Sequence, residues 1–440
     1  MRRSLPFICL GLAGILPFKG KAQALRDTIS GGVSLQQCVQ YAITHQPLVQ
    51  QALIDQRIIE TTIKSKLADW YPQVNLNANL QDNFQLPAIL FNGQKIYTTT
   101  YGTSTAAIGV TQNIFDRDVL LASHTANDVR TEIRQVTEAD KINITVAVSQ
   151  AFYLVLLNLK QIDLTTEDIV RLQRSLKDAY SQYQAGIVDK IDYKRATISL
   201  NNSIAQKKGQ EDSLKAKYSV LKLSMGYPDS AQLQLQFDSA QLQKEIFIDT
   251  TGPINYNNRI EYKLLQTQSK LLQENIKYNK LAYFPTISAF GSYDFNFYNN
   301  SFSKLYNQNY PTSYVGLQLS LPIFQGFKRV ENIRGAELQF QRNLSTINGF
   351  KDTINTQYQQ ALAAYKSNLE NYTILDENLR LATDVYNTLE VQYKAGIKTY
   401  LDVITGETDL RSAEISYANA LYQVLISKVS VQKALGIVQY

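Results

Sequence analysis

Four short segments of the chain alternate between apolar and polar residues, and they form two pairs. The run 73–81 places four apolar residues opposite Gln and Asn residues: Val74, Leu76, Ala78 and Leu80. A similar run surrounds Ile108, and the second pair occupies 287–297 and 315–323. Alternation with a period of two is typical of a strand with one apolar and one polar face. The sequence therefore predicts strands at about 72–84, 103–115, 285–298 and 313–324.

Two much longer segments repeat apolar or tyrosine residues every seven positions. The repeated residues are Val148, Val155, Ile162, Ile169, Leu176 and Tyr183 in the first, and Tyr358, Tyr365, Tyr372, Leu379, Tyr386 and Tyr393 in the second. Heptads sustained without Pro or Gly predict helices that supercoil with a neighbour. Helices are expected over 118–184 and 328–394, followed by returning helices over 190–225 and 400–436. At about 1.5 Å per residue the first would be about 100 Å long, which no compact domain of this size could contain.

The two halves of the chain carry the same motifs about 210 residues apart. Tyr183-Gln184-Ala185-Gly186-Ile187 corresponds to Tyr393-Lys394-Ala395-Gly396-Ile397, and Trp70-Tyr71-Pro72 corresponds to Tyr283-Phe284-Pro285. Like segments at a fixed spacing predict a tandem duplication. The first repeat is expected over 25–226 and the second over 254–440, joined by a linker or equatorial segment at 227–253 with a short strand near 232–237. Each repeat has the order helix, strand, strand, long helix, tight tip and returning helix.

Residues 1–24 have the pattern of a secretory signal peptide. Arg2 and Arg3 precede an apolar run, and Ala22-Gln23-Ala24 provides a cleavage site. Cleavage would leave Cys38 as the only cysteine, so no disulfide within one chain is expected. It would also lower the formal net charge from +6 by four, to +2. A charge this small argues against binding to nucleic acid, which needs a concentrated basic face.

The mature sequence contains no uninterrupted apolar run of the roughly 18 residues that a membrane helix needs. The nearest candidate, 144–159, is broken by polar residues. A membrane segment is therefore expected to be β-structure. The polar strand faces are almost uncharged, as a water-filled lumen tolerates, and aromatic residues gather where strands meet helices, as at the interfaces of a membrane barrel. These aromatic residues are Trp70, Tyr71, Phe115, Tyr283, Phe284 and Phe324.

Four strands cannot close a barrel, and an open strand edge is not tolerated in lipid. Oligomerisation is therefore expected. Two copies would supply about eight strands and three about twelve, and membrane barrels use both numbers. A soluble sheet packed against helices is the alternative, because alternation alone is compatible with either.

Little in the sequence indicates catalysis. The only histidines are His45 and His124, and neither a phosphate-binding glycine loop nor a zinc-binding helix motif occurs. No enzyme activity, cofactor or metal site is expected. The main alternative to a channel is a non-transporting coiled-coil protein that spaces or tethers the cell envelope. A tether has no use for a polar, nearly uncharged strand face, and this favours the channel.

The order of these motifs resembles the TolC family of outer-membrane efflux proteins over essentially the whole mature chain. The residues that carry the resemblance are Ser34-Leu35, Ala42, Gln46-Pro47, the two aromatic-Pro junctions, Leu321-Pro322-Ile323-Phe324-Gln325-Gly326 and the two Tyr-x-Ala-Gly-Ile tips. The resemblance implies a mainly α homotrimer in which four strands per chain form a twelve-stranded β-barrel, continued by an α-barrel of coiled-coil hairpins across the periplasm. It implies an exit duct for tripartite efflux or type I secretion in the outer membrane of a Gram-negative bacterium. The implied partners are outer-membrane lipid, a periplasmic adaptor and an inner-membrane pump of the RND or ABC type.

In this family the hairpin tips close the periplasmic entrance and contact the adaptor. The resemblance assigns the closing gate to Asp192, Tyr393 and Lys398, where Lys398 stands for the usual Arg and cannot form its bidentate contact. It assigns an acidic selectivity ring to Asp402, whereas the second acidic position falls on Thr405, with Glu407 as a candidate substitute. It assigns adaptor docking to Ala185-Gly186-Ile187 and Ala395-Gly396-Ile397. The alternative interpretation is that the two Asp residues only cap or charge a helix and that the tips only make turns.

Overall fold

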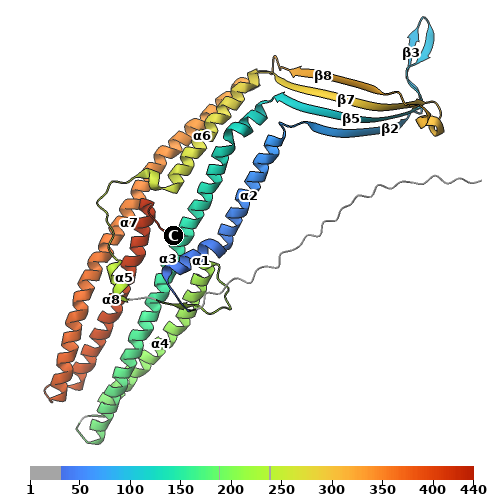
Figure 1. Ribbon diagram of the computed structural model, residues 1–440. Coiled ribbons are helices and arrows are strands. Elements are labelled where there is room, and N and C mark those ends of the chain that lie inside the picture. The colour runs from blue at the N-terminus through green and yellow to red at the C-terminus, as the bar shows by residue number, and fades with distance from the viewer. Residues whose placement is uncertain (1–30, 188, 237–238) are drawn as a thin grey trace, which may run out of the picture.

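The molecule is elongated, with a four-stranded sheet at one end and long helical hairpins that reach away from it (Figure 1). This computed structural model describes residues 31–187, 189–236 and 239–440. The chain is mainly helical, as the heptads predict. The predicted signal peptide, 1–24, lies outside the described residues.

In the first half the elements are β1 (Gly32–Val33), α1 (Leu35–His45), α2 (Pro47–Ala68), β2 (Gln73–Asp82), β3 (Ala88–Phe91), β4 (Gln94–Tyr97), β5 (Gly102–Phe115), α3 (Arg117–Gln184) and α4 (Lys190–Met225). In the second half they are β6 (Gln234–Leu235), α5 (Ser239–Lys244), η1 (Tyr256–Asn258), α6 (Ile260–Lys280), η2 (Leu281–Tyr283), β7 (Thr286–Asn299), η3 (Phe302–Asn307), β8 (Thr312–Ser320), α7 (Lys328–Lys394) and α8 (Tyr400–Leu435).

Strand β8 and the hairpin β3–β4 differ from the sequence predictions. Strand β8 ends at Ser320 rather than near 324, because Pro322 has no N–H to donate to a strand ladder. The hairpin β3–β4 is an additional element, which turns at Asn92-Gly93. Both turn residues have positive φ, the conformation that a two-residue hairpin turn requires.

The four-stranded sheet is antiparallel, in the order β2-β5-β7-β8, and its register produces one apolar face. Leu76 lies beside Ile108, and Ile108 lies beside Tyr293. On the polar face the Thr105 hydroxyl donates to the side-chain oxygen of Asn296 at 2.9 Å. The alternation in the sequence therefore places like residues beside one another across the strands.

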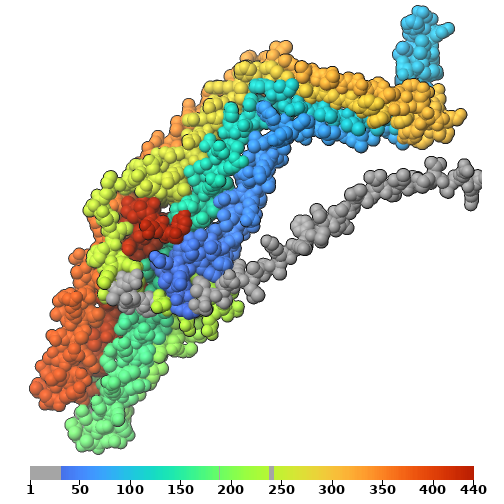
Figure 2. Space-filling model, viewed as in Figure 1, coloured from blue at the N-terminus to red at the C-terminus, as the bar shows by residue number. Residues whose placement is uncertain are grey.

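Both faces of this sheet are open to solvent in the single chain. All 10 residues of β2 are exposed, and on β8 Val315 and Leu317 are 87% and 73% exposed. Figure 2 shows the sheet as a thin layer that extends beyond the helices. The alternative of a soluble sheet packed against helices is therefore wrong, and something outside the chain must cover the apolar face.

The long helices pack side by side in the order α4, α3, α8, α7. Nearer the sheet, α2 and α6 take the places of α4 and α8, so the order becomes α2, α3, α6, α7. Helix α3 therefore lies inside the layer along its whole length, whereas α2, α4 and α7 lie at its edges.

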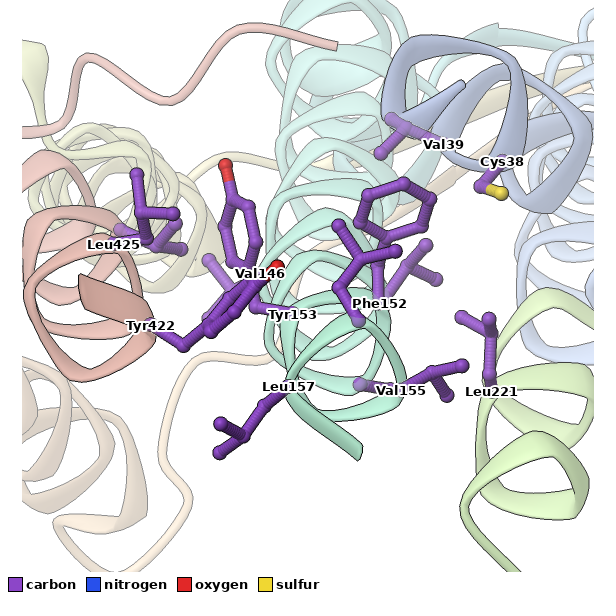
Figure 3. Packing of buried hydrophobic residues seen from close by; sticks show 14 of the residues in the cluster. Cys38, Val39, Val146, Phe152, Tyr153, Val155, Leu157, Leu221, Tyr422 and Leu425 are labelled. Atoms are coloured by element: carbon purple, nitrogen blue, oxygen red, sulfur yellow. The ribbon is translucent and has the colours of Figure 1, made fainter. Parts of the chain in front are cut away.

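The main hydrophobic core lies where α1, α3, α4 and α8 meet (Figure 3). Phe152 of α3 lies on the side that faces Cys38 of α1 and Leu221 of α4, and Tyr422 of α8 packs on the other side (Figure 3). The predicted seam residue Val155 is fully buried. Each large side chain buried in this way contributes about 1.5–3 kcal/mol to folding.

One stretch of α3 is apolar enough, by length and composition, to cross a membrane, with a mean hydropathy of 1.7 over 18 residues. The sequence prediction required an uninterrupted apolar run, and polar residues interrupt the apolar part of this helix. However, 67% of the stretch is buried inside the protein, as in the core helix of a folded domain.

The described parts of the segment 227–253, which are 227–236 and 239–253, lie against the middle of the helices. Strand β6 pairs in parallel with β1, so the short strand expected near 232–237 is reduced to two residues. Two heptad tyrosines of α7 hold this segment through their hydroxyl groups. Tyr365 donates to the carbonyl of Ile246 at 2.9 Å, and Tyr358 donates to that of Thr250 at 3.2 Å. Tyrosine therefore provides both packing and a hydrogen bond at positions where an aliphatic residue would only pack.

Both returning helices end at a glycine in the left-handed conformation. φ is +67° at Gly226 and +71° at Gly436. A Cβ at Gly226 would lie 2.8 Å from the backbone of Gln46, and one at Gly436 would lie 2.6 Å from the backbone of Asn258. Glycine alone suits both the conformation and the close approach, so it fixes how each returning helix meets the helices nearer the sheet.

We expect Gly226→Ala to lower the free energy of unfolding by more than about 1 kcal/mol, because alanine is strained at positive φ and its Cβ would press on Gln46. The matched control is Gly209→Ala in the exposed middle of α4, where a Cβ would meet nothing within 4 Å. That change should stabilise the helix by about 0.5–1 kcal/mol. Denaturant unfolding followed by circular dichroism measures both, and equal effects would contradict this account of the junction.

Candidate functional site at the hairpin tips

The two long helices end in the same tight turn. Gly186 and Gly396 have φ of +72° and +75°. In the first tip the N–H of Gly186 donates to the carbonyl of Tyr183, and the N–H of Ile187 donates to that of Gln182, both at 3.0 Å. The second tip repeats both bonds at 2.9 Å. This pair of bonds is the Schellman motif, in which a left-handed glycine satisfies the last carbonyl groups of a helix.

The tips present apolar side chains to solvent. Ile187 and Ile397 are each 72% exposed, and Ala185 and Ala395 are exposed beside them. The predicted docking segments are therefore real turns, as the alternative interpretation holds, and they are also accessible to another protein.

A group of tyrosines packs between the returning helices and the long helices near the tips. The rings of Tyr183 and Tyr193 are 5.0 Å apart, and those of Tyr393 and Tyr400 are 6.1 Å apart. The hydroxyl of Tyr393 donates to the side-chain oxygen of Gln182 at 3.1 Å, which joins the two tips within one chain. Burial raises the pKa of Tyr400 to about 12, so this phenol stays neutral.

Asp192 lies in the first turn of α4, where the N-terminal cap is the neighbouring Asp189. The structure describes no hydrogen bond or ion pair between Asp192 and either Tyr393 or Lys398. The charge of Asp192 does reach Tyr393, whose pKa is raised mainly by burial and to a smaller extent by Asp178 and Asp192. Asp192 and Tyr393 are thus close enough to interact electrostatically, but Tyr393 donates to Gln182 within the chain, and no contact of Lys398 with either residue is described.

Asp402 completes the N-terminal cap of α8. Its carboxylate accepts hydrogen bonds from the backbone N–H of Thr399 at 2.9 Å and from the Thr399 hydroxyl at 2.7 Å. These bonds lower the pKa of Asp402 below its usual value. Thr405 donates its hydroxyl to the carbonyl of Leu401, four residues earlier on the same helix. The capping role is therefore present, and it leaves Asp402 ionised at the mouth of the hairpin.

Glu407 does not share this location. Its side chain is 4% exposed, and it faces Arg171 of α3 at 3.7 Å. It is enclosed by the helices of its own chain, so it does not supply the missing second acid of the entrance. The sequence did contain a signal for this burial. Residues seven positions apart lie on the same face of a supercoiled helix, and Glu407 and Glu414 precede the buried Leu421 by fourteen and seven positions.

Metal binding has no candidate in the described ranges, where no group of three or more His, Cys, Asp or Glu side chains is arranged to hold an ion. The only cysteine among these residues, Cys38, is buried in the main core, and burial raises the pKa of its thiol to about 12.

Comparison with known proteins gives consistent matches. The model of the family described as "Outer membrane efflux protein" matches residues 38–227 and 264–437. The chain is 22% identical over 435 residues to the outer membrane protein TolC of Escherichia coli, covering 93% of this chain and 83% of that protein. It is 23% identical over 418 residues to the outer membrane protein OprJ of Pseudomonas aeruginosa, covering 91% and 84%. The open state of the MtrE outer membrane channel of Neisseria gonorrhoeae superposes with a TM-score of 0.73 at 17% identity, over 91% of this chain and 88% of that one.

Proposed function

The chain belongs to the family of outer membrane efflux proteins, and from that membership we propose that it forms the exit duct of a tripartite efflux or type I secretion system. The observation that carries the proposal is a sheet with a bare apolar face and two unpaired edges. In lipid each unpaired backbone group costs several kcal/mol, so one copy alone is an unstable membrane segment. Pairing with further copies removes both edges.

The helices support closure along the same two edges. On one side, below β2, the exposed apolar residues include Ile54 and Ile58 of α2 and Ile191 and Ile198 of α4. On the other side, below β8, α7 exposes Leu338, Ile374, Leu381 and Val385, each by more than half. Exposed apolar seams of this kind are typical of helix–helix interfaces. Because the two edges differ, the contact between copies is head-to-tail and closes in a ring.

We infer a ring of three copies. Two copies would give a barrel of about eight strands, whose interior side chains fill almost completely. Three copies give about twelve strands, an even number that membrane barrels use, and leave room for a lumen. The polar, nearly uncharged sheet face would then line water, and the apolar face would contact lipid. The long hairpins would form the α-barrel that extends into the periplasm.

The tandem organisation is part of this proposal, with a signal peptide at 1–24, repeats at 25–226 and 254–440, and the equatorial segment 227–253 between them. Helices α3 and α7 have 68 and 67 residues, and α4 and α8 have 36 each. Equal hairpins from the two repeats would place their tips at the same level around the ring. The tips are therefore the proposed entrance.

The proposed gate consists of Asp192 with Tyr393 and Lys398, and the proposed selectivity ring consists of Asp402 with Thr405. Ala185-Gly186-Ile187 and Ala395-Gly396-Ile397 would receive the periplasmic adaptor, which connects the duct to an inner-membrane pump of the RND or ABC type. The exposure of both isoleucines supports a docking role. Conduction through such a duct needs no catalytic step or cofactor.

The first test concerns assembly and conduction. We expect mass measurement of the purified protein in detergent or lipid to give a trimer, and planar bilayers to show discrete channel currents. A stable folded monomer in lipid would contradict the ring. A trimer that conducts no current would instead support the alternative function, a coiled-coil spacer of the cell envelope.

The second test concerns the gate. Tyr393→Phe combined with Lys398→Ser should raise single-channel conductance, because it removes the two donors that the proposed gate assigns to Asp192. Contacts of this kind contribute about 1–3 kcal/mol each before solvent screening, and less at a wet entrance, so each single change should do less than the pair. The matched control is Lys394→Ser, since Lys394 pairs with Glu390 on its own helix; this change should leave conductance unaltered.

Two further variants distinguish Asp192 from Gln182 as the partner through which Tyr393 closes the gate. If the gate contact reaches Asp192, then Asp192→Asn should reproduce the effect of Tyr393→Phe. If Tyr393 acts only through Gln182, then Gln182→Leu will reproduce it and Asp192→Asn will not. The second pattern, in protein that assembles normally, would remove Asp192 from the gate.

The third test concerns ion selectivity. Asp402→Asn should reduce the preference for cations, measured as the reversal potential under a salt gradient, because it removes the one acidic ring. Asparagine retains an oxygen for the cap, and Thr399→Ala is the complementary control that weakens the cap and keeps the charge. If Thr399→Ala changes the reversal potential as much as Asp402→Asn does, the role of Asp402 is structural.

A further inference from the structure

Between the tips and the main core, α3, α4 and α8 enclose charged side chains that the proposed duct does not use. The buried charge cluster consists of Asp168, Arg171, Ser203, Glu407, Arg411 and Glu414. Counted over the whole residue, Asp168 is 1% exposed and Glu407 is 3% exposed. Carboxyl groups are rarely buried so completely, because removal from water costs several kcal/mol unless the charge is compensated. The cluster lies where the first hairpin, α3–α4, meets α8 of the second.

One part of the cluster is hydrogen-bonded and joins three helices. The hydroxyl of Ser203 on α4 donates to the carboxylate of Asp168 on α3 at 2.7 Å. Arg411 of α8 donates to the Ser203 oxygen at 2.8 Å and lies 3.4 Å from the same Asp168 oxygen. This part holds α8 against the first hairpin.

The other part is incompletely paired. Arg171 donates to Glu414 at 3.3 Å and lies 3.7 Å from Asp168. Its Nε faces Oε1 of Glu407 at 3.7 Å, which is too long for a hydrogen bond, and both of these buried atoms lack a hydrogen-bond partner. Glu407 is therefore held in the interior without the bonds that would stabilise its ionised form.

The charges of the cluster do not balance, because three carboxyl groups face two guanidinium groups. The other titratable groups nearby do not correct this: Arg174 and Glu167 of α3, whose charges reach Tyr386 and Glu414, offset each other. Helix α7 contributes Glu390, whose charge opposes ionisation of Glu407, and the neutral Tyr386; α8 contributes the neutral Tyr400; α4 contributes only the hydroxyl of Ser203. Burial raises the pKa of Glu407 to about 7, and the charge of Asp168 is the second cause of this rise. The charges of Arg171 and Arg411 act in the opposite direction and lower the pKa.

The packing beside Glu407 is tight. Its neighbour Gly406 is buried, and a Cβ there would lie 2.6 Å from the side chain of Leu389 on α7. Close contact on this side leaves Glu407 little room to turn toward water while the helices stay packed. If Glu407 ionises, either the helices move apart or a negative charge remains buried without compensation.

We propose that the buried charge cluster is a proton-controlled latch between the two helical hairpins. With Glu407 protonated, two carboxylates face two guanidinium groups and α8 stays packed on α3. Loss of that proton leaves one negative charge in excess, and the hairpins separate more readily. Because the cluster lies between the tips and the main core, its protonation would make the opening of the proposed entrance depend on the surrounding pH.

The direction of the pH dependence follows from the raised pKa. The packed state binds the proton of Glu407 more tightly than the separated state, where the carboxyl has its ordinary pKa near 4.5. The latch is therefore strongest below about pH 4.5, weakens as the pH rises toward 7, and changes no further above that value. A carboxyl with a lowered pKa would produce the opposite trend.

A labelling experiment on the assembled protein tests the latch directly. Val403→Cys, introduced in a Cys38→Ala background, places a thiol at a buried position one turn before Glu407. At pH 8 the maleimide labelling rate should fall on the order of tenfold or more when Glu407→Gln is added, because one pKa unit corresponds to a tenfold change in an equilibrium. Asp409→Asn, which removes an exposed carboxyl two residues further along α8, should leave the rate unchanged. Equal rates in all three proteins would overturn the proposal.

Single-channel conductance from pH 4.5 to 8 provides a second readout that needs no cysteine. It should rise with pH in the wild type and in Asp409→Asn, and it should rise much less in Glu407→Gln, where burial still raises the pKa of Glu414. A channel whose pH response is undiminished by Glu407→Gln would overturn the latch and leave the proposed duct intact. If no current is seen in any variant, the duct proposal fails, and the labelling rates still decide whether the latch exists.

Discussion

The unpaired backbone groups along the two edges of the sheet are the constraint on which the rest of the structure depends. Strands β2 and β8 pair on one side only, and the apolar face between them fits lipid better than water. Lipid supplies no hydrogen bonds, so in the proposed ring the strands of other copies would complete the ladder. Helices α2 and α4 lie at the edge of the helical layer below β2, and α7 lies at the edge below β8. A single rotation that relates neighbouring copies can therefore close both the sheet and the helical layer.

The two ends of the molecule are stabilised by different interactions. Near the middle, large aliphatic and aromatic side chains bury one side of α3 against α1 and α4 and another against α8, and tyrosines of α7 hold the equatorial segment. Toward the tips, the contacts between the hairpins include the hydrogen bond from Tyr393 to Gln182, the one from Ser175 to Tyr400, and the buried charge cluster. Charged and polar contacts depend on protonation and on solvent, whereas an apolar core does not. The tip end is therefore the end that can respond to conditions or to a partner while the middle stays packed.

Much of the fold was predictable because its signals are local and periodic. Heptads located the long hairpins, alternation located the sheet and its apolar face, and a glycine in each tip located the turns. The hairpin β3–β4 was missed because its signal is a single Asn-Gly pair within a short segment. The site was less predictable, because helix-terminal carboxylates look alike in sequence. Asp402 proved to be part of a cap and Asp192 did not. The heptad step from Leu421 indicated that Glu407 is buried, but its neighbour Arg171 lies more than two hundred residues away in the chain and was not predictable.

The central claim is that the edge formed by β2, α2 and α4 of one copy meets the edge formed by β8 and α7 of the next. Ile198 of α4 and Val385 of α7 lie on these two edges at similar sequence distances from their tips, and both are more than half exposed in the single chain. Oxidation, in membranes, of protein that carries Ile198→Cys and Val385→Cys in a Cys38→Ala background measures the claim directly. The account predicts covalent dimers and trimers and nothing larger, and neither single-cysteine protein should form them. Covalent species larger than a trimer, or equal cross-linking through Ile198→Cys alone, would contradict it.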